Sequence, residues 1–304
     1  MLYNILPKII VDILTELDTD KLYEIRLRAE LPVMVNFDNQ YWYLHQDGLS
    51  FVEKNAIRLS AEVIEEIVFR SADYSLYTVT KQINNGYITI KGGIRIGIAG
   101  EVVWDGDNIR AVKNFNAINI RIPHEVFGCC DSIFPYLATN HSPLNALIIS
   151  PPGAGKTTIL RDIARKWSTV QPLQNILIID ERSEIAAVYN SVAQLFVGTN
   201  IDIISNCNKL YAFEYAVRAM RPDIIITDEV SNAKDFQAIS YALSCGISVI
   251  ASIHARTHTD LFAKRDFQKN ILENQLMDRF IVLSTNNGPG TINGIYNNKL
   301  ERID

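Results

Sequence analysis

The sequence ALIISPPGAGKTTIL spans residues 146–160 and combines an apolar run, a glycine-containing turn and a helix-forming segment. Residues 146–149 are all apolar, as in a strand that is buried on both faces. Gly153 and Gly155 let the backbone curl so that successive N–H groups point inward, and Lys156 adds a positive charge. This order predicts a phosphate-binding loop between a strand and a helix.

The residue types of this loop suit a bound nucleoside triphosphate with its magnesium ion. We expect the Lys156 ammonium to contact the β and γ phosphates and the Thr157 hydroxyl to bind Mg²⁺. Ser150 stands where the pattern GxxxxGK[ST] has its first glycine. A glycine-rich turn that only caps a helix is the alternative. The residues expected to contact the nucleotide are Pro152, Gly153, Ala154, Gly155, Lys156, Thr157 and Thr158.

Further apolar runs follow the loop, with helical stretches between them. They cover residues 176–179, 224–226 and 248–250. Continuous apolar strands that alternate with helices predict a parallel sheet covered on both faces. Because ligands of such sheets bind outside the carboxyl ends of the strands, the residues that follow each run are the candidates for a site.

Acidic and imidazole side chains occupy these strand ends. Asp228 is the candidate for organising Mg²⁺, and Glu229 is the candidate for positioning and deprotonating the attacking water. Glu181 competes with Glu229 for the role of base, and Glu184 is equally well explained as part of a charged loop. We expect His254 to hydrogen-bond the γ-phosphate and to report its loss.

The amino-terminal part of the chain has a different pattern. Apolar residues recur every three or four positions from residue 2 to residue 17, and again over 61–70, which predicts two helices. Short stretches with strand-like alternation and turn signals lie between and after them. This part is therefore predicted to be a small α+β domain with a meandering sheet.

The boundary between the two parts is expected near residue 140. A helix is predicted over residues 131–137, and the segment Thr139–Pro143 is the most linker-like of the chain. We therefore expect an α+β domain over residues 1–140 and an α/β domain with a parallel sheet over residues 141–304.

Composition narrows the classes of protein further. The 304 residues are 48% hydrophobic and carry a formal net charge of −5, so the chain can form a core, and its overall field repels nucleic acid. No apolar run approaches the about 20 residues that span a bilayer. The start of the chain lacks a charged segment before its apolar residues, and the four cysteines form no CxxC pair. We expect a cytoplasmic protein in a reducing compartment with no nucleic-acid partner.

Four motifs in this order resemble those of the secretion ATPase superfamily, which includes type II and type IV secretion motors and pilus retraction ATPases. The Walker A loop, acidic box, Walker B segment and histidine box of that family look like residues 150–158, 180–184, 216–229 and 249–254. The resemblance implies a RecA-like P-loop NTPase domain, ATP and Mg²⁺ as ligands, and hydrolysis of ATP.

One branch of the superfamily is more similar still. The stretches PPGAGKTTILRDIAR, IIDERSEIAA, MRPDIIITDEV, GIRIGIAGEVV and INIRIPHEVFGC look like those of the stage III sporulation protein AA family. This similarity extends to about residue 258. It departs where Val230-Ser231-Asn232 follows Glu229, because the family commonly has an apolar residue, a glycine and a basic or polar residue there.

The resemblance also implies partners. It predicts a hexameric ring with nucleotide between protomers, in which Arg95 and Arg121 of one subunit reach the phosphates of the next. It implies a motor that powers or assembles the channel between mother cell and forespore, docked on a membrane protein at the inner face of the membrane. A nucleotide-binding switch or scaffold with little hydrolysis is the main alternative, and a nucleic-acid motor is a weaker one.

Overall fold

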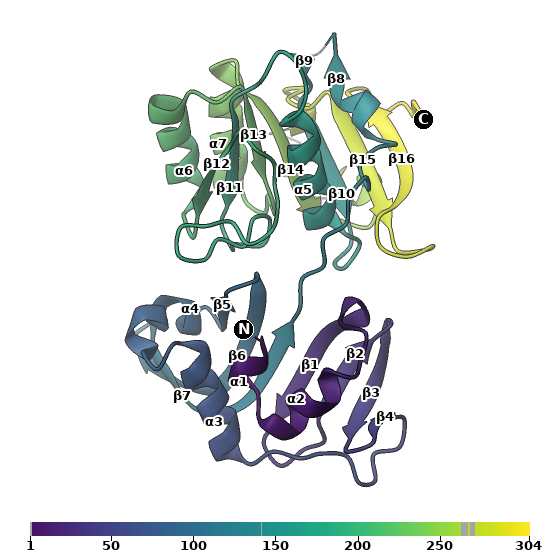
Figure 1. The fold of residues 1–304 in the computed structure, drawn as a ribbon. Coiled ribbons are helices and arrows are strands. Elements are labelled where there is room, and N and C mark those ends of the chain that lie inside the picture. The colour runs from purple at the N-terminus through teal and green to yellow at the C-terminus, as the bar shows by residue number, and fades with distance from the viewer. Residues whose placement is uncertain (1, 141, 263–266, 268–270) are drawn as a thin grey trace. The chain divides into compact units, whose positions relative to one another are not determined.

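The computed structural model describes the chain except for residues 1, 141, 263–266 and 268–270. The chain divides into two compact units, drawn in Figure 1. Unit 1 comprises Met1–His124 and Tyr189–Gln194, and unit 2 comprises Glu125–Val188 and Leu195–Asp304. No helix in the described part of the chain is both long enough and apolar enough to cross a membrane.

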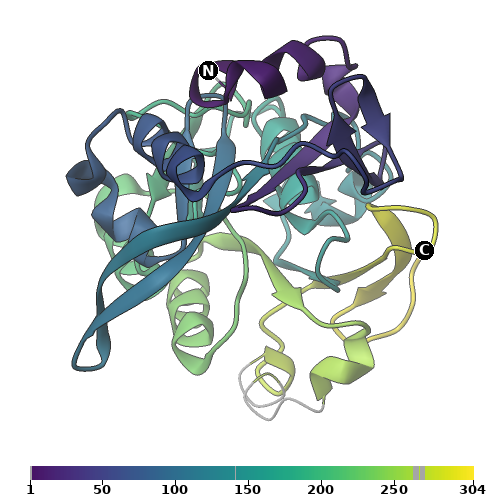
Figure 2. The same cartoon turned by 90° about the horizontal axis from the view of Figure 1, so that it is seen from below.

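Unit 1 is an antiparallel sheet with helices on one of its faces. Its elements are α1 (Leu2–Ile5), α2 (Lys8–Leu14), η1 (Thr19–Lys21), β1 (Leu22–Arg28), β2 (Met34–Phe37), β3 (Gln40–His45), β4 (Gly48–Ser50), α3 (Ala61–Ser71), η2 (Leu76–Val79), α4 (Thr80–Asn84), β5 (Tyr87–Ile90), β6 (Ile94–Asp105) and β7 (Asn108–Arg121). Among the described residues the strand order is β4-β3-β2-β1-β7-β6-β5. The β6–β7 hairpin projects beyond its neighbours (Figure 2).

Period-two alternation gives this sheet one apolar and one polar face. Ile25, Leu27, Ile96 and Ile120 are buried in one core with the apolar residues of α2 and α3. The helix predicted over 61–70 is confirmed as α3. The helix predicted from residue 2 is divided, because Pro7 has an extended backbone and precedes α2 as its N-cap residue.

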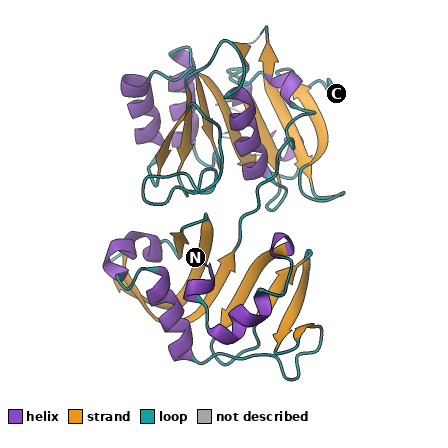
Figure 3. Ribbon diagram, in the orientation of Figure 1, coloured by secondary structure: helices purple, strands orange, loops and turns teal. Residues whose placement is uncertain are grey.

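Unit 2 is a mostly parallel sheet between helices (Figure 3). Its elements are η3 (Phe134–Leu137), β8 (Ala138–Thr139), β9 (Ser142–Pro143), β10 (Ala146–Ser150), α5 (Lys156–Trp167), β11 (Ile176–Asp180), β12 (Ile201–Ser205), α6 (Lys209–Tyr215), η4 (Ala216–Met220), β13 (Ile224–Thr227), α7 (Ala233–Ser244), β14 (Ser248–His254), α8 (His258–Phe262), β15 (Arg279–Ser284) and β16 (Thr291–Asn297). In the described residues the strand order is β12-β11-β13-β14-β10-β15-β16, with only β16 antiparallel to its neighbour.

The predicted parallel sheet is therefore confirmed. β10, β11 and β13 are buried along their whole length, as continuous apolar runs require. Alternate strand residues share a core with the apolar residues of α6 and α7. The carboxyl ends of β11, β13, β14 and β10 are neighbours in the sheet, so the residues that follow these strands lie along one edge.

The division between the units comes earlier in the chain than the predicted boundary, which falls at residue 141, outside the described residues. Residues 125–140 belong to unit 2 because they are fixed to α5. Asp162 accepts hydrogen bonds from the N–H groups of Gly128 and Cys130 at 3.3 and 2.9 Å. The helix predicted over 131–137 is reduced to the short 3₁₀ helix η3, whose second residue is Pro135.

Candidate functional site

The turn after β10 has the backbone shape that the sequence predicted for a phosphate-binding loop. Gly153 and Gly155 have φ of +76° and +86°, in the left-handed region that favours glycine. A Cβ on Gly155 would also lie 3.2 Å from the backbone nitrogen of Gly290, which donates a hydrogen bond to the Ala154 carbonyl at 3.0 Å. Ser150 is the last residue of β10, so a non-glycine residue fits there.

A chain of polar contacts joins this loop to two neighbouring strand ends. Lys156, the first residue of α5, places its Nζ 3.0 Å from Nδ1 of His254 at the end of β14. Nε2 of the same imidazole lies 2.7 Å from Oε1 of Glu229, and Arg182 pairs with Oε2 of Glu229 at 2.5 Å. The structure thus brings three of the predicted residues, Lys156, His254 and Glu229, into one network.

The donors in this network fix the tautomer of His254. A lysine ammonium can only donate, so Nδ1 must accept the bond from Lys156. The proton of the neutral ring is then on Nε2, which donates to the Glu229 carboxylate. Burial lowers the pKa of Lys156, and the negative charges of Glu229 and Asp228 oppose that effect.

Asp228 follows β13 and is a buried carboxyl group with a raised pKa. It is 4% exposed, and burial together with the nearby charge of Asp180 raises its pKa to about 7. Its Oδ1 is buried and has no hydrogen-bond partner among the residues that the structure describes. The unpartnered carboxylate oxygen of Asp228 and the hydroxyl of Thr157, at the start of α5, are oxygen donors of the kind that Mg²⁺ prefers.

The predicted acidic box separates into groups with different surroundings. Asp180 is fully buried, and its carboxylate accepts hydrogen bonds from three successive N–H groups, Glu184 to Ala186, at 2.7 to 3.1 Å. Arg161 of α5 holds the carbonyls of the same segment. Asp180 therefore shapes the loop after β11, whereas Glu181 remains half-buried at the site.

Sequence reasoning missed Lys209, which begins α6 and is 3% exposed. Its Nζ donates to Oε2 of Glu181 at 2.8 Å and to the backbone carbonyl of Glu229 at 3.0 Å. Its charge also lowers the pKa of Asp228, against the effect of burial. Lys209 lies outside the four motifs, and no spacing in the sequence connects it to them.

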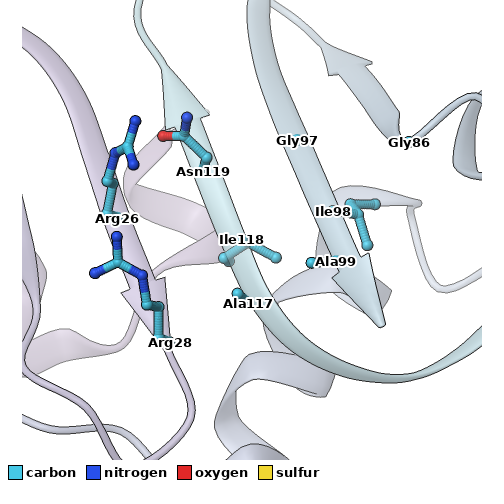
Figure 4. Close-up of a pocket in the computed structure, with 9 residues that line it drawn as sticks. All are labelled: Arg26, Arg28, Gly86, Gly97, Ile98, Ala99, Ala117, Ile118 and Asn119. Atoms are coloured by element: carbon cyan, nitrogen blue, oxygen red, sulfur yellow. The ribbon is translucent and has the colours of Figure 1, made fainter. Parts of the chain in front are cut away.

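The remaining predicted residues, Arg95 and Arg121, lie in unit 1. They are register partners on β6 and β7, and the Arg95 guanidinium stacks 3.8 Å from the centre of the Tyr87 ring. On β1 and β7 of the same sheet, a pocket of about 330 Å³ is formed by Arg26, Arg28 and Asn119 above small residues of β6 and β7 (Figure 4). This part of the unit 1 sheet is rich in guanidinium groups.

The strand order of unit 2 and the turn after β10 define the class of the protein by its fold, a RecA-like α/β domain preceded by a smaller antiparallel α+β unit. A solved structure of the ATPase DotB from Legionella pneumophila matches with a TM-score of 0.59 at 16% identity, over 91% of this chain and 76% of that one. The pilus retraction motor PilT with bound ADP matches with a TM-score of 0.58 at 15% identity, over 89% and 76%. These likenesses establish the fold.

The family follows from sequence comparison. The family model described as "Sporulation stage III, protein AA" matches residues 1–303. Stage III sporulation protein AA of Bacillus subtilis (strain 168) is 36% identical over 301 residues, which cover 96% of this chain and 93% of the relative. The chain belongs to the sporulation stage III protein AA family.

Proposed function

We propose that this protein binds and hydrolyses ATP with Mg²⁺ as a motor of the sporulation channel. The observation that supports this most directly is the hydrogen-bonded chain from Lys156 through His254 to Glu229, beside a buried carboxylate at Asp228. It places a phosphate-binding cation and a candidate base on the two sides of one imidazole. Such an arrangement suits the transfer of a γ-phosphoryl group to water.

Hydrolysis at this site forms a bond between water oxygen and the γ-phosphorus and breaks the bond to the β,γ-bridging oxygen. The turn from Pro152 to Gly155 and the Lys156 ammonium hold the phosphates. Glu229 orients the water and accepts its proton. Thr157 and Asp228 would hold Mg²⁺, which would supply positive charge to the phosphate oxygens.

Two glutamates compete for the role of base, and their contacts favour Glu229. Its carboxylate is joined to Lys156 through His254, so it is linked to the group that contacts the γ-phosphate. The carboxylate of Glu181 is paired with Lys209, and that of Glu229 with Arg182, so the link through His254 is what distinguishes Glu229. We infer that Glu229 is the base, and that Glu181 and His254 link the loss of the γ-phosphate to movement of the units.

The assembly is proposed from the family resemblance and from the arginines of unit 1. We infer a homo-oligomeric ring, hexameric by analogy, in which Arg95 and Arg121 contact nucleotide bound to a neighbouring subunit. An arginine supplied in this way stabilises charge on the transferred phosphoryl group. The ring would act in the cytoplasm on a membrane protein of the sporulation channel complex.

A nucleotide-dependent switch with little hydrolysis is the second candidate. It is favoured by one observation, that both carboxylate oxygens of Glu229 are engaged, one by His254 and the other by Arg182. A base held in this way is less able to take a proton from water. Phosphate release per chain, measured on the assembled oligomer with and without its membrane partner, separates a motor from such a switch.

The decisive experiment for the base compares Glu229→Gln with Glu214→Gln, a control on the exposed side of α6. Glu229→Gln should bind ATP as the wild type does and lose turnover by about 10²-fold or more. Glu214→Gln should keep both. Unimpaired hydrolysis by Glu229→Gln would remove Glu229 as base and promote Glu181. If the wild-type oligomer hydrolyses no ATP, the nucleotide-dependent switch becomes the favoured function.

A further inference from the structure

We propose that Lys209 is a positioning residue that fixes the positions of Glu229 and Glu181 by donating hydrogen bonds to both. The inference rests on the proposed function, because it concerns the same acidic site. One ammonium group donates to the Glu229 carbonyl at 3.0 Å and to the Glu181 carboxylate at 2.8 Å. It therefore connects the residues that follow β13 with those that follow β11.

The local environment of Lys209 opposes a cation on two grounds. Its side chain is 3% exposed, and burial disfavours a charged ammonium. It is also the first residue of α6, where the helix dipole favours negative charge. The neighbouring acidic groups compensate for both effects. Lys209 is therefore the buried counter-charge of this edge of the sheet.

Glu229 needs such a partner because its backbone is strained. Its φ is +48°, in the left-handed region that residues with a Cβ rarely adopt. Its N–H donates to Oγ of Ser252 at 3.1 Å, and the next N–H, of Val230, donates to the Ser252 carbonyl at 2.8 Å. Lys209 holds the Glu229 carbonyl, so the strained residue is fixed on both of its peptide groups.

The strained conformation decides where the Glu229 carboxylate points. In the structure that carboxylate is within hydrogen-bond distance of His254 and Arg182. Without the ammonium of Lys209, the Glu229 carbonyl loses its charged donor and the Glu181 carboxylate loses its partner. We expect the Glu229 carboxylate to leave its position while the phosphate-binding loop stays formed, because the hydrogen bonds of the Lys209 ammonium within the described part of the chain go to Glu181 and Glu229 and not to that loop.

The test compares Lys209→Met, Lys209→Arg and, as control, Lys234→Met, whose lysine is exposed on α7. Lys209→Met should lower kcat about 10²-fold with the Kd for ATP changed less than about threefold. Lys209→Arg keeps the charge and a donor pair and should recover kcat to within about tenfold of the wild type. Lys234→Met should match the wild type in kcat and in Kd.

Hydrogen exchange provides a second readout that does not need turnover. The peptide that contains Glu229 and Val230 should exchange faster in Lys209→Met than in the wild type, and at the wild-type rate in Lys234→Met. If the wild type hydrolyses no ATP, the proposed function fails, and exchange alone decides this inference.

Three results would overturn the role of Lys209. They are a kcat of Lys209→Met within twofold of the wild type, equal losses of kcat in the methionine and arginine variants, and unchanged exchange of the Glu229 peptide. If Lys209→Met does not fold, the arginine variant carries the test. In that case, wild-type exchange and a kcat within tenfold support the inference, and a larger loss with intact ATP binding refutes it.

Discussion

Replacing Asp228 by asparagine should stabilise the protein at alkaline pH while it abolishes magnesium-dependent nucleotide binding. The carboxyl group is buried beside Asp180, and its pKa is raised from 3.8 to about 7. An acid whose pKa rises on folding binds its proton more tightly in the native state. Stability is therefore lost as the pH rises from about 4 to about 7, and the penalty is complete above that range.

The size of the pKa shift of Asp228 determines how much stability the asparagine variant should gain. Each pKa unit corresponds to about 1.4 kcal/mol, so ionised Asp228 costs the native state about 4 kcal/mol at pH 8. At pH 5 the native carboxyl group is mostly protonated, so the same linkage costs the native state only about 2 kcal/mol. Asparagine carries no charge at either pH. The gain in Asp228→Asn should therefore be about twice as large at pH 8 as at pH 5.

Urea unfolding of wild type and Asp228→Asn at pH 5 and pH 8, in the presence of a chelator, measures this difference. Asp202→Asn, on an exposed part of β12, is the matched control and should change the free energy of unfolding by less than about 0.5 kcal/mol. A gain that is the same at both pH values would show that ionisation of Asp228 is not its cause. A loss of stability at pH 8 would show that the ionised Asp228 carboxylate does not destabilise the native state.

Two further substitutions test the packing around α5. Gly155→Ala should lower the free energy of unfolding by about 1 kcal/mol more than Gly246→Ala does, as measured by thermal unfolding. Both glycines have left-handed φ, but only Gly155 lies against Gly290. Equal losses of stability in the two variants would show that a side chain at position 155 does not collide with Gly290. Asp162→Ala should cost about 3–5 kcal/mol, since it leaves the buried guanidinium of Arg165 without its carboxylate. A loss below about 1 kcal/mol in chemical denaturation would contradict that pairing.

The sequence was most informative where composition and local geometry agree. The buried strands of unit 2 were predictable because strands covered on both faces have continuous apolar runs, such as residues 146–149 and 176–179, and here these runs alternate with helical stretches. The turn after β10 was predictable because its glycines adopt backbone conformations that other residues avoid. Helix α3 was predictable from its amphipathic spacing.

Elements decided by tertiary packing were not predictable in the same way. The segment after His124 joins unit 2 because Asp162 and Arg165, far along the chain, bind its backbone. Pro7 divides the opening helix, although the apolar period continues through it. The local pattern contains no trace of the contacts with Asp162 and Arg165, whereas Pro7 itself is the local signal for the break in the helix.

The candidate site was partly accessible from sequence. Residues at the ends of neighbouring parallel strands must lie along one edge, and so Glu229 and His254 could be expected near Lys156. Which partner each side chain takes could not be read from the spacing. Lys209 and Arg182 reach the site through side-chain conformations that depend on the folded sheet.

Every role proposed for this site requires that ATP binds to the turn that precedes α5. Calorimetric titration of the folded wild-type protein with ATP and Mg²⁺, beside Lys156→Ala, tests it most directly. We expect about one site per chain in the wild type and a loss of at least about tenfold in affinity for the variant. No heat of binding with the wild type, or equal affinity for both proteins, would contradict the account.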